Sequence, residues 1–367
     1  MSFPTKTVVQ LAGSALTCAL VVTMTSESPS SAVTPTSTAV TARAAVAPRA
    51  APGVDVHVAG FNVQSVGVDK RDGNRLPWRQ RRSTVISQIL REHTDVIGAQ
   101  EVNPSNVFRN RLVDGTNQMF DLRNGLNRRG GHFALNSNAA ANCLNPASTY
   151  HCKPRNRAAS NSERILYNTS TMLLMHRGFV KYTRQSASAK GMGMAWVMLR
   201  SRRNGHLFLF TSTHLDPPNR SVRAAQWRQM VSNIKRIRRN MPVVSVGDFN
   251  TQKMDPMART MLPMMRNAGV GDVLNQQYRV NPSRGVRAES VVNGWINSNN
   301  RESRNIPSYS YPNNHSKTGN SIDYIFASNA LRVKRFEMVI DYNPRTLQVT
   351  GTMPSDHNML AATIVLP

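Results

Sequence analysis

Several of the scarce acidic side chains in this sequence stand, together with Asn, where apolar runs end. The chain has 20 Asp and Glu against 46 Lys and Arg in 367 residues. Glu101 closes the apolar run 95–101, and Asp248 and Asn250 close the run that begins at Val243. Carboxylate and carboxamide oxygens suit a hard divalent cation such as Mg²⁺. These residues are therefore candidate metal ligands at strand ends.

A second group of polar residues includes histidine. Asp323 lies inside the apolar run 321–326, where a carboxylate is costly unless it is paired or bound to a cation. The pair Asp356 and His357 directly precedes the last apolar run. An imidazole exchanges protons near neutral pH, and a carboxylate on its second nitrogen fixes its tautomer. Each acid taken singly could cap a turn, but that interpretation does not explain the whole set.

The elements that must position these residues follow from apolar periodicity. Alternation at period two predicts a first strand over 54–63, and helical spacing predicts helices over 78–92, 221–238 and 255–268. Many strands separated by few helices favour an α/β (α+β) fold in which helices cover a pair of mixed sheets. Further strands are expected over residues 95–101, 164–167, 172–175, 195–200, 207–213, 243–246, 322–327, 333–340 and 359–365.

The N-terminal segment has the pattern of an export signal. Residues 1–24 carry Lys6 and then a short apolar run over 8–22, as secretory signals do. Polar residues interrupt this run, which is shorter than the roughly 20 apolar residues that a membrane span needs. The Ser/Thr/Ala/Pro-rich stretch 25–53 reads as a propeptide or linker. We expect a secreted protein without stable membrane insertion.

The remaining chain reads as one domain over 54–367. No internal repeat and no further linker follow Gly53. Removal of the signal would leave Cys143 and Cys152 as the two cysteines, and an oxidising compartment would pair them. Two free surface thiols are the alternative.

The charge balance indicates an acidic partner. The formal net charge is +26, which favours polyanions, although an Arg-rich surface without a charged substrate is an alternative interpretation. The composition, with 40% hydrophobic residues, excludes a wholly disordered or collagen-like chain. Two basic runs on expected helices, 79–82 and 235–239, are candidate phosphate contacts or solvated faces.

Seven short motifs occur in order along the chain: Phe61-Asn62, Gln100-Glu101, Ser162 to Tyr167, Thr211 to Leu215, Gly247 to Asn250, Ile322 to Ile325 and Ser355 to His357. Their order resembles the endonuclease/exonuclease/phosphatase superfamily, which includes deoxyribonucleases, exonuclease III-like enzymes, sphingomyelinases and phosphatases. The resemblance covers Val56 to Pro367 and implies a four-layer αββα sandwich of two mixed β-sheets flanked by helices.

The resemblance implies a metal centre and a water-orienting pair. Glu101 matches the principal metal ligand, with Asn62 and Asp356 around the same cation or its waters. Asp248 and Asn250 match the pair that orients the attacking water and the scissile phosphate. The implied cofactor is Mg²⁺ or Mn²⁺.

The resemblance also implies two histidines beside the phosphate. His357 and His214 match these positions, with Asp323 orienting His357 and Glu163 orienting His214. Asp216, where related nucleases often have a small apolar residue, is expected to cap the helix that follows.

We therefore expect a secreted, metal-dependent phosphoesterase. A nuclease that hydrolyses phosphodiester bonds of DNA or RNA with little sequence specificity fits the charge best, and we expect a monomer with nucleic acid as its substrate. A sphingomyelinase-like phospholipid phosphodiesterase is the alternative, with residues 291–296 as a candidate membrane-entering segment. Another phosphatase, or a non-catalytic polyanion-binding protein, is a further alternative.

Overall fold

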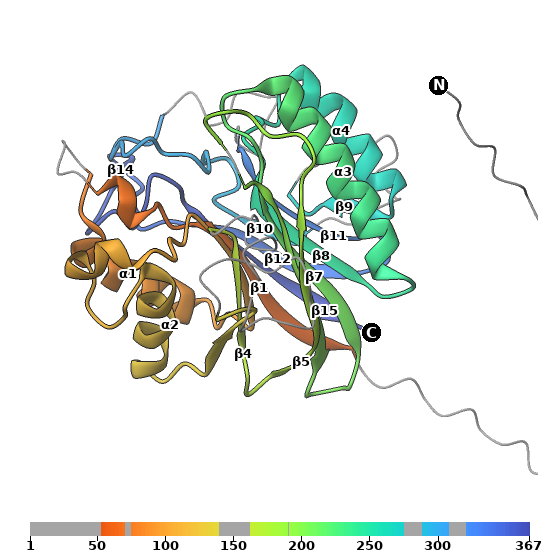
Figure 1. Cartoon of the computed structure of the whole chain (residues 1–367), viewed down its shortest axis with the longest axis horizontal. Helices are drawn as coiled ribbons and strands as arrows, with labels where there is room; N and C mark the ends of the chain where they lie inside the picture. The colour runs from red at the N-terminus through yellow and green to blue at the C-terminus, as the bar shows by residue number, and fades with distance from the viewer. Residues whose placement is uncertain (1–52, 70–74, 139–161, 190, 275–287, 308–320) are drawn as a thin grey trace, which may run out of the picture. The chain divides into compact units, whose positions relative to one another are not determined.

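Two mixed β-sheets face one another in the computed structural model, which describes residues 53–69, 75–138, 162–189, 191–274, 288–307 and 321–367 (Figure 1). The first sheet has seven strands in the order β10-β12-β15-β1-β2-β4-β3. Their bounds are β1 Val54–Asn62, β2 Val96–Gln100, β3 Phe133–Leu135, β4 Arg164–Asn168, β10 Ala288–Val292, β12 Arg332–Val339 and β15 Met359–Leu366.

The second sheet has six strands in the order β5-β6-β7-β8-β11-β9. Two further short strands, β13 (Tyr342–Asn343) and β14 (Gln348–Val349), pair with each other. The bounds in the second sheet are β5 Met172–Lys181, β6 Gly193–Ser201, β7 Leu207–His214, β8 Val243–Asp248, β9 Val270–Asp272 and β11 Asp323–Ser328.

Helices cover the outer face of each sheet (Figure 1). The helices α1 (Trp78–Arg91) and α2 (Gln118–Arg128) pack on the first sheet. The helices α3 (Arg220–Arg238) and α4 (Pro256–Asn267) pack on the second. Two 3₁₀ turns, η1 (Val66–Val68) and η2 (Asn106–Arg111), lie in loops that follow β1 and β2.

Three apolar clusters separate these four layers. One fills the space between the sheets and includes Val58 of β1, Phe210 of β7 and Val246 of β8. A second lies between the first sheet and α1 and α2, and a third between the second sheet and α3 and α4. The expected four-layer αββα sandwich is confirmed.

The two sheets approach closely beside the ends of β2 and β8. A Cβ atom added at Gly98 of β2 would overlap with the side chains of Val246 and Ser212 in the facing sheet. Gln100, two residues further on, donates from Nε2 to Ser212 Oγ across the same gap at 2.9 Å. The sequence therefore needs a glycine here to bring the strand ends together.

The strand register places the ends of several strands at one edge of the sandwich. β1 runs parallel to β2 and antiparallel to β15, and β7 runs parallel to β8 and antiparallel to β6. β11 is antiparallel to β8, with Asp323 opposite Asp248. The C-terminal ends of β1, β2, β7 and β8 thus share an edge with the N-terminal ends of β11 and β15.

The expected elements are observed with small shifts at their ends, except that the strand expected over 172–175 extends to Lys181 as β5. The helix α2 and the short strands β3, β9, β10, β13 and β14 were not among the expected elements. In α2 the apolar Met119, Leu122 and Leu126 are buried. The buried acid Asp121 and Gly125 interrupt this apolar face. Because a polar residue normally lies on the exposed face of a helix, the apolar pattern of α2 is incomplete.

Some sequence expectations lie outside the described residues. Residues 1–24, almost all of the stretch 25–53, and both Cys143 and Cys152 belong to this part of the chain. Export, the linker and the disulfide bond therefore remain predictions. Residues Ala50–Pro367 form one compact unit.

The expected role of Asp216 is wrong. Asn219 caps α3, since its side chain accepts from the backbone N–H groups of Ser221 and Val222. Asp216 is fully buried, and its two oxygens accept from the N–H groups of Asn219 and Ser186 at 2.8 and 3.2 Å. Asp216 thus joins the loop after β7 to the loop after β5. Its carboxylate can be buried because each of its oxygens accepts a hydrogen bond.

Candidate active site

The nine candidate residues gather at the shared edge of the two sheets. Each lies at a strand end or within a few residues of one, where the backbone turns away from its ladder. β1 ends at Asn62, β7 at His214 and β8 at Asp248. Glu101 follows β2 and Asn250 follows β8, while β11 begins at Asp323. Glu163 precedes β4, and the pair Asp356 and His357 precedes β15.

Asn62 joins carboxylates from both sheets. Its Nδ2 donates to Glu101 Oε1 at 3.0 Å and to Asp248 Oδ2 at 3.1 Å. Its Oδ1 accepts from the backbone N–H of Gln64 at 3.1 Å, which fixes the orientation of the amide. The Nδ2 atom of Asn62 therefore connects Glu101 and Asp248. A role of Asn62 beside a bound cation remains a proposal.

Glu101 and Asn250 occupy the left-handed region of the backbone. Their φ angles are 59° and 47°, which are unfavourable for residues other than glycine. Glu101 Oε2 accepts from the N–H of Ser65 at 3.0 Å, and Asn250 Nδ2 donates to the carbonyl of Leu215 at 2.9 Å. Such conformations persist where the surrounding contacts enforce them, and they are frequent at functional sites.

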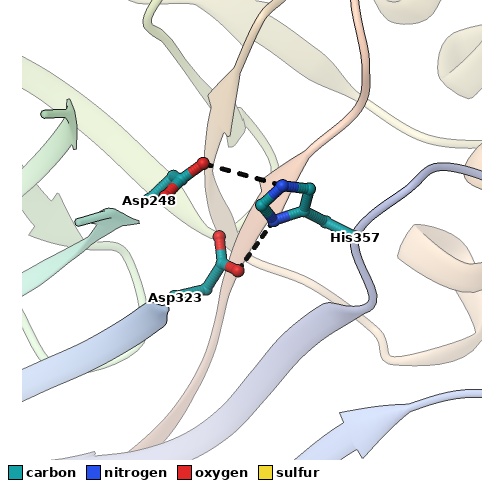
Figure 2. A group of neighbouring side chains, drawn as sticks. All are labelled: Asp248, Asp323 and His357. Atoms are coloured by element: carbon teal, nitrogen blue, oxygen red, sulfur yellow. Dashed lines mark hydrogen bonds and ion pairs between the residues drawn. The ribbon is translucent and has the colours of Figure 1, made fainter. Parts of the chain in front are cut away.

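His357 is held between two carboxylates (Figure 2). Its Nδ1 lies 2.8 Å from Asp323 Oδ2 and its Nε2 lies 3.7 Å from Asp248 Oδ2. Burial alone would lower the pKa of the imidazole, but Asp323 and Asp248 offset this effect and raise the pKa well above its ordinary value. The two carboxylates thus favour the protonated form of His357, whereas Asn299 Nδ2, 3.0 Å from Nε2, can donate only to the neutral ring.

His214 lies on the other side of Asp248. Its Nε2 is 3.4 Å from Asp248 Oδ2. Burial lowers the pKa of His214, but the charges of Asp248, Glu101 and Glu163 raise it by more. One oxygen of Asp248 thus faces both histidines, while its Oδ1 accepts from the N–H of Asn250 at 2.8 Å.

Glu163 is fully buried, and burial raises its pKa to about 7. The charge of His214 acts in the opposite direction on this carboxyl. The two groups therefore interact electrostatically, and Asp248 also lies within ion-pair distance of His214. An orienting role of Glu163 on the His214 ring remains a proposal.

The chemistry of the donor set fits a hard divalent cation. Asp356 is largely buried, and burial raises its pKa. Ser355 Oγ lies 3.1 Å from Asp356 Oδ1 and 2.7 Å from the carbonyl oxygen of Asn62, so Asp356 is held beside the end of β1. The oxygens of Glu101 and Asp356 would hold the cation, because crowded and partly buried carboxylates are stabilised by a divalent charge.

A second acidic group contains an imidazole. Among the described residues, Asp248, Asp323 and His357 each offer one potential ligand atom, all within 4.8 Å of one another. Both ring nitrogens of His357 already face hydrogen-bonding or charged partners. We therefore interpret these three residues as an acid–base group next to the candidate metal ligands.

The sequence analysis missed the segment 297–302, which supports His357. Asn299 Nδ2 lies 3.0 Å from His357 Nε2, and Ser298 Oγ accepts from the N–H of Asp323 at 3.1 Å. Asn300 Nδ2 donates to a backbone carbonyl two residues before His357. The signal in the sequence was the concentration of Asn and Ser, residues that bond to loop backbone.

The two basic runs do not form a continuous phosphate-binding surface. In the run 79–82 on α1, Arg81 and Arg82 are buried. The run 235–239 lies at the C-terminal end of α3 (Arg220–Arg238), about 23 to 27 Å along the helix axis from the end that follows His214. Neither run therefore provides a group of exposed basic side chains beside the candidate site.

The endonuclease/exonuclease/phosphatase family model matches residues 59–357. The chain therefore belongs to the endonuclease/exonuclease/phosphatase family, a group of hydrolases that act on phosphoester bonds and typically depend on divalent metal ions. This confirms the resemblance on which the candidate residues were chosen. A comparison with curated protein sequences gave no match.

Solved structures show the same fold at low sequence identity. A family member from Bacteroides vulgatus is 19% identical, with a TM-score of 0.60 over 86% of this chain and 100% of that one. A mannosyl-6-phosphatase from Bacteroides thetaiotaomicron is 17% identical, with a TM-score of 0.57 over 85% and 100%. TDP2 from D. rerio, complexed with a single-strand DNA product, is 15% identical, with a TM-score of 0.51 over 84% and 98%.

Proposed function

We propose that this chain is a secreted, Mg²⁺- or Mn²⁺-dependent nuclease that cleaves phosphodiester bonds of DNA or RNA with little sequence specificity. The observation that carries the proposal is the arrangement around Asp248, whose Oδ2 faces His214, His357 and the Asn62 amide at 3.1 to 3.7 Å. This arrangement combines a proton acceptor with two cationic donors. Such a set can act on a phosphate ester.

The side chains divide the work of hydrolysis between them. His357 and His214, in their protonated forms, donate to non-bridging phosphate oxygens and offset the charge that develops there. Asp248 accepts a hydrogen bond from the attacking water and takes its proton, while Asn250 helps to orient this water. When bound, a divalent cation polarises a phosphoryl oxygen and offsets charge on the leaving oxygen.

Charge favours a nucleic acid over a small phosphomonoester. The net charge of +26 attracts a polymer that carries one phosphate per nucleotide, because each phosphate contact releases counterions. The DNA product bound to the D. rerio TDP2 structure is consistent with this substrate class. Mannosyl-6-phosphatase, another structural neighbour, makes a phosphomonoester the necessary comparison.

Residues 291–296 do not form a membrane wedge, since Val291 and Trp295 pack against the core between the sheets. A different observation favours the lipid alternative. Val107 of η2 is 77% exposed and Val68 of η1 is 46% exposed, and both turns lie in loops at the edge that carries the site. Of the described helices, none is long and apolar enough to cross a membrane.

A substrate panel tests the proposal directly. We expect purified protein to nick plasmid DNA or cleave RNA in Mg²⁺ or Mn²⁺, and to lose this activity in a chelator. Sphingomyelin vesicles and a phosphomonoester should be hydrolysed at least tenfold more slowly. Faster release of phosphocholine from the vesicles would favour the lipid phosphodiesterase, and binding of DNA without turnover of any substrate would favour the polyanion-binding protein.

Salt dependence tests which arginines contact the nucleic acid. Arg109 of η2 and Arg301, two residues after Asn299, are exposed in loops at the edge that carries the site. Replacing both with Gln should reduce the slope of log affinity against log salt by about 1.8, since each phosphate contact contributes about 0.9. The measurement is DNA binding at several salt concentrations.

The matched control for this experiment is Arg236→Gln with Arg239→Gln. These residues are also exposed and the change in charge is the same, but they lie at the far end of α3. The control should leave the slope unchanged. Equal effects of the two pairs would mean that charge acts only through the overall field of the protein.

A further inference from the structure

Arg81 connects several backbone segments from inside the protein. Its side chain lies on α1 and is 1% exposed. Its Nε donates to the carbonyl of Leu76 at 3.1 Å and its Nη2 to that of Gln64 at 2.7 Å. Its Nη1 donates to Pro354 O at 2.9 Å and also to Val63 O. One guanidinium group thus donates to four carbonyl oxygens, and three of these hydrogen bonds are buried.

Two of these segments carry the candidate metal ligands. Val63 and Gln64 directly follow Asn62, and the next residue, Ser65, donates its N–H to Glu101. Pro354 lies two residues before Asp356. The ladder between β1 and β15 ends at the pair Gly60 and Leu360. Beyond that pair, Arg81 contacts both departing segments, where no β-ladder holds them together.

The charge of Arg81 is also directed at the acidic site. Asp69 Oδ1 lies 3.8 Å from its Nη2. Burial lowers the pKa of the guanidinium to about 10, while Asp69, Asp356, Glu101 and Glu302 counteract this shift. The guanidinium remains protonated at neutral pH, and its positive charge by itself opposes a cation near Glu101 and Asp356. Arg81 can therefore strengthen a metal site only by positioning the ligands.

We infer that Arg81 is a positioning residue for the metal site: by binding the carbonyls of Val63, Gln64 and Pro354 it sets the separation of Glu101 and Asp356 and hence the affinity for a divalent cation. The inference rests on the proposed metal dependence. A planar guanidinium has five N–H donors in a fixed fork, whereas a lysine ammonium has three donors on one atom. Lysine would retain the charge but could not reach all four carbonyls.

Arg82 offers a matched control on the same helix. It is also buried, and its guanidinium pairs with Asp114 and, at 2.7 Å, with Asp121. These acids belong to α2 and the loop before it, so Arg82 ties α2 to α1. Arg82→Lys should cost stability without changing the segments that carry Asn62 and Asp356.

The test is Mn²⁺ binding to the full chain without substrate, measured by calorimetry or by electron paramagnetic resonance. Arg81→Lys should raise the Mn²⁺ Kd at least tenfold, while Arg82→Lys should leave it within about twofold of wild type. Saturating Mn²⁺ should restore the kcat of Arg81→Lys on DNA to within about threefold. Thermal melts would identify any variant that is unfolded, and Arg81→Gln would then replace Arg81→Lys. Loss of the positive charge alone would lower the Mn²⁺ Kd of Arg81→Gln, so a higher Kd in this variant would still report lost positioning.

The outcomes separate this inference from the proposed function. An unchanged Mn²⁺ Kd in a folded Arg81 variant would refute the positioning role alone. Equal weakening by Arg81→Lys and Arg82→Lys would also refute it, because the effect would then be general destabilisation. A wild-type protein that binds no Mn²⁺ would refute the metal site itself and this inference with it.

Discussion

Replacing His357 with Ala should reduce kcat on DNA by about a hundredfold to ten-thousandfold, the contribution typical of a positioned acid–base group. The imidazole is held at 2.8 Å by Asp323 and faces Asp248, so no other side chain can take its position without rearrangement. Asp323→Asn should lower kcat in the same direction, because an amide does not stabilise the charged imidazole as a carboxylate does. His214→Ala should have an effect of similar size.

Turnover at saturating substrate and thermal melting measure these effects separately. The matched control is His176→Ala, since His176 lies exposed on β5 and should be removable without loss of rate. Each site variant should melt as a folded protein. A folded His357→Ala or His214→Ala variant with near-normal kcat would remove that histidine from the proposed chemistry.

The sequence indicates the candidate residues because they stand at the ends of apolar runs, and the structure places them at one edge of the sandwich. Glu101, Asp248 and Asp323 are acids within or next to apolar runs, in a chain where acids are few. β1 runs parallel to β2 and β7 runs parallel to β8, so Asn62 lies near Glu101 and His214 lies near Asp248 at one edge. That both sheets contribute to one edge followed from the family resemblance, and the contact between Asn62 and Asp248 fits it.

Residues that act through long-range contacts could not be predicted in this way. Arg81 and Arg82 belong to a basic run that looks like a solvated helix face, and the carbonyl of Pro354, one partner of Arg81, lies 273 positions away. Asn299 is one of many loop asparagines, and its contact with His357 depends on the tertiary position of the segment 297–302. Apolar periodicity carries no information about such partners.

The same limitation explains the errors at Asp216 and α2. A short polar residue before a helix is usually its N-cap, but here Asn219 stands closer to the first turn and Asp216 faces inward. The acid of α2, Asp121, is buried because it pairs with Arg82 of α1. In both cases a tertiary partner satisfies the carboxylate and overrides the local pattern.

Glu101→Gln should lower activity at a given Mg²⁺ concentration by about a hundredfold or more, since a bound metal contributes several kcal/mol to transition-state stabilisation and each 1.4 kcal/mol corresponds to about tenfold. The two oxygens of Glu101 accept from Asn62 Nδ2 and from the N–H of Ser65. A glutamine has a single oxygen, so its amide NH₂ would face one of these donors. The variant would thus lose both the negative charge and one hydrogen bond.

The measurement is plasmid nicking against Mg²⁺ concentration, together with Mg²⁺ binding by calorimetry without substrate. The half-activating Mg²⁺ concentration and the Kd should rise together in Glu101→Gln. Glu289→Gln is the matched control, because Glu289 is exposed and pairs with Arg332 on the neighbouring strand β12, and it should leave both values unchanged. Full wild-type activity in chelator, or a folded Glu101→Gln variant with an unchanged Mg²⁺ requirement, would contradict the assignment of Glu101 as the principal metal ligand.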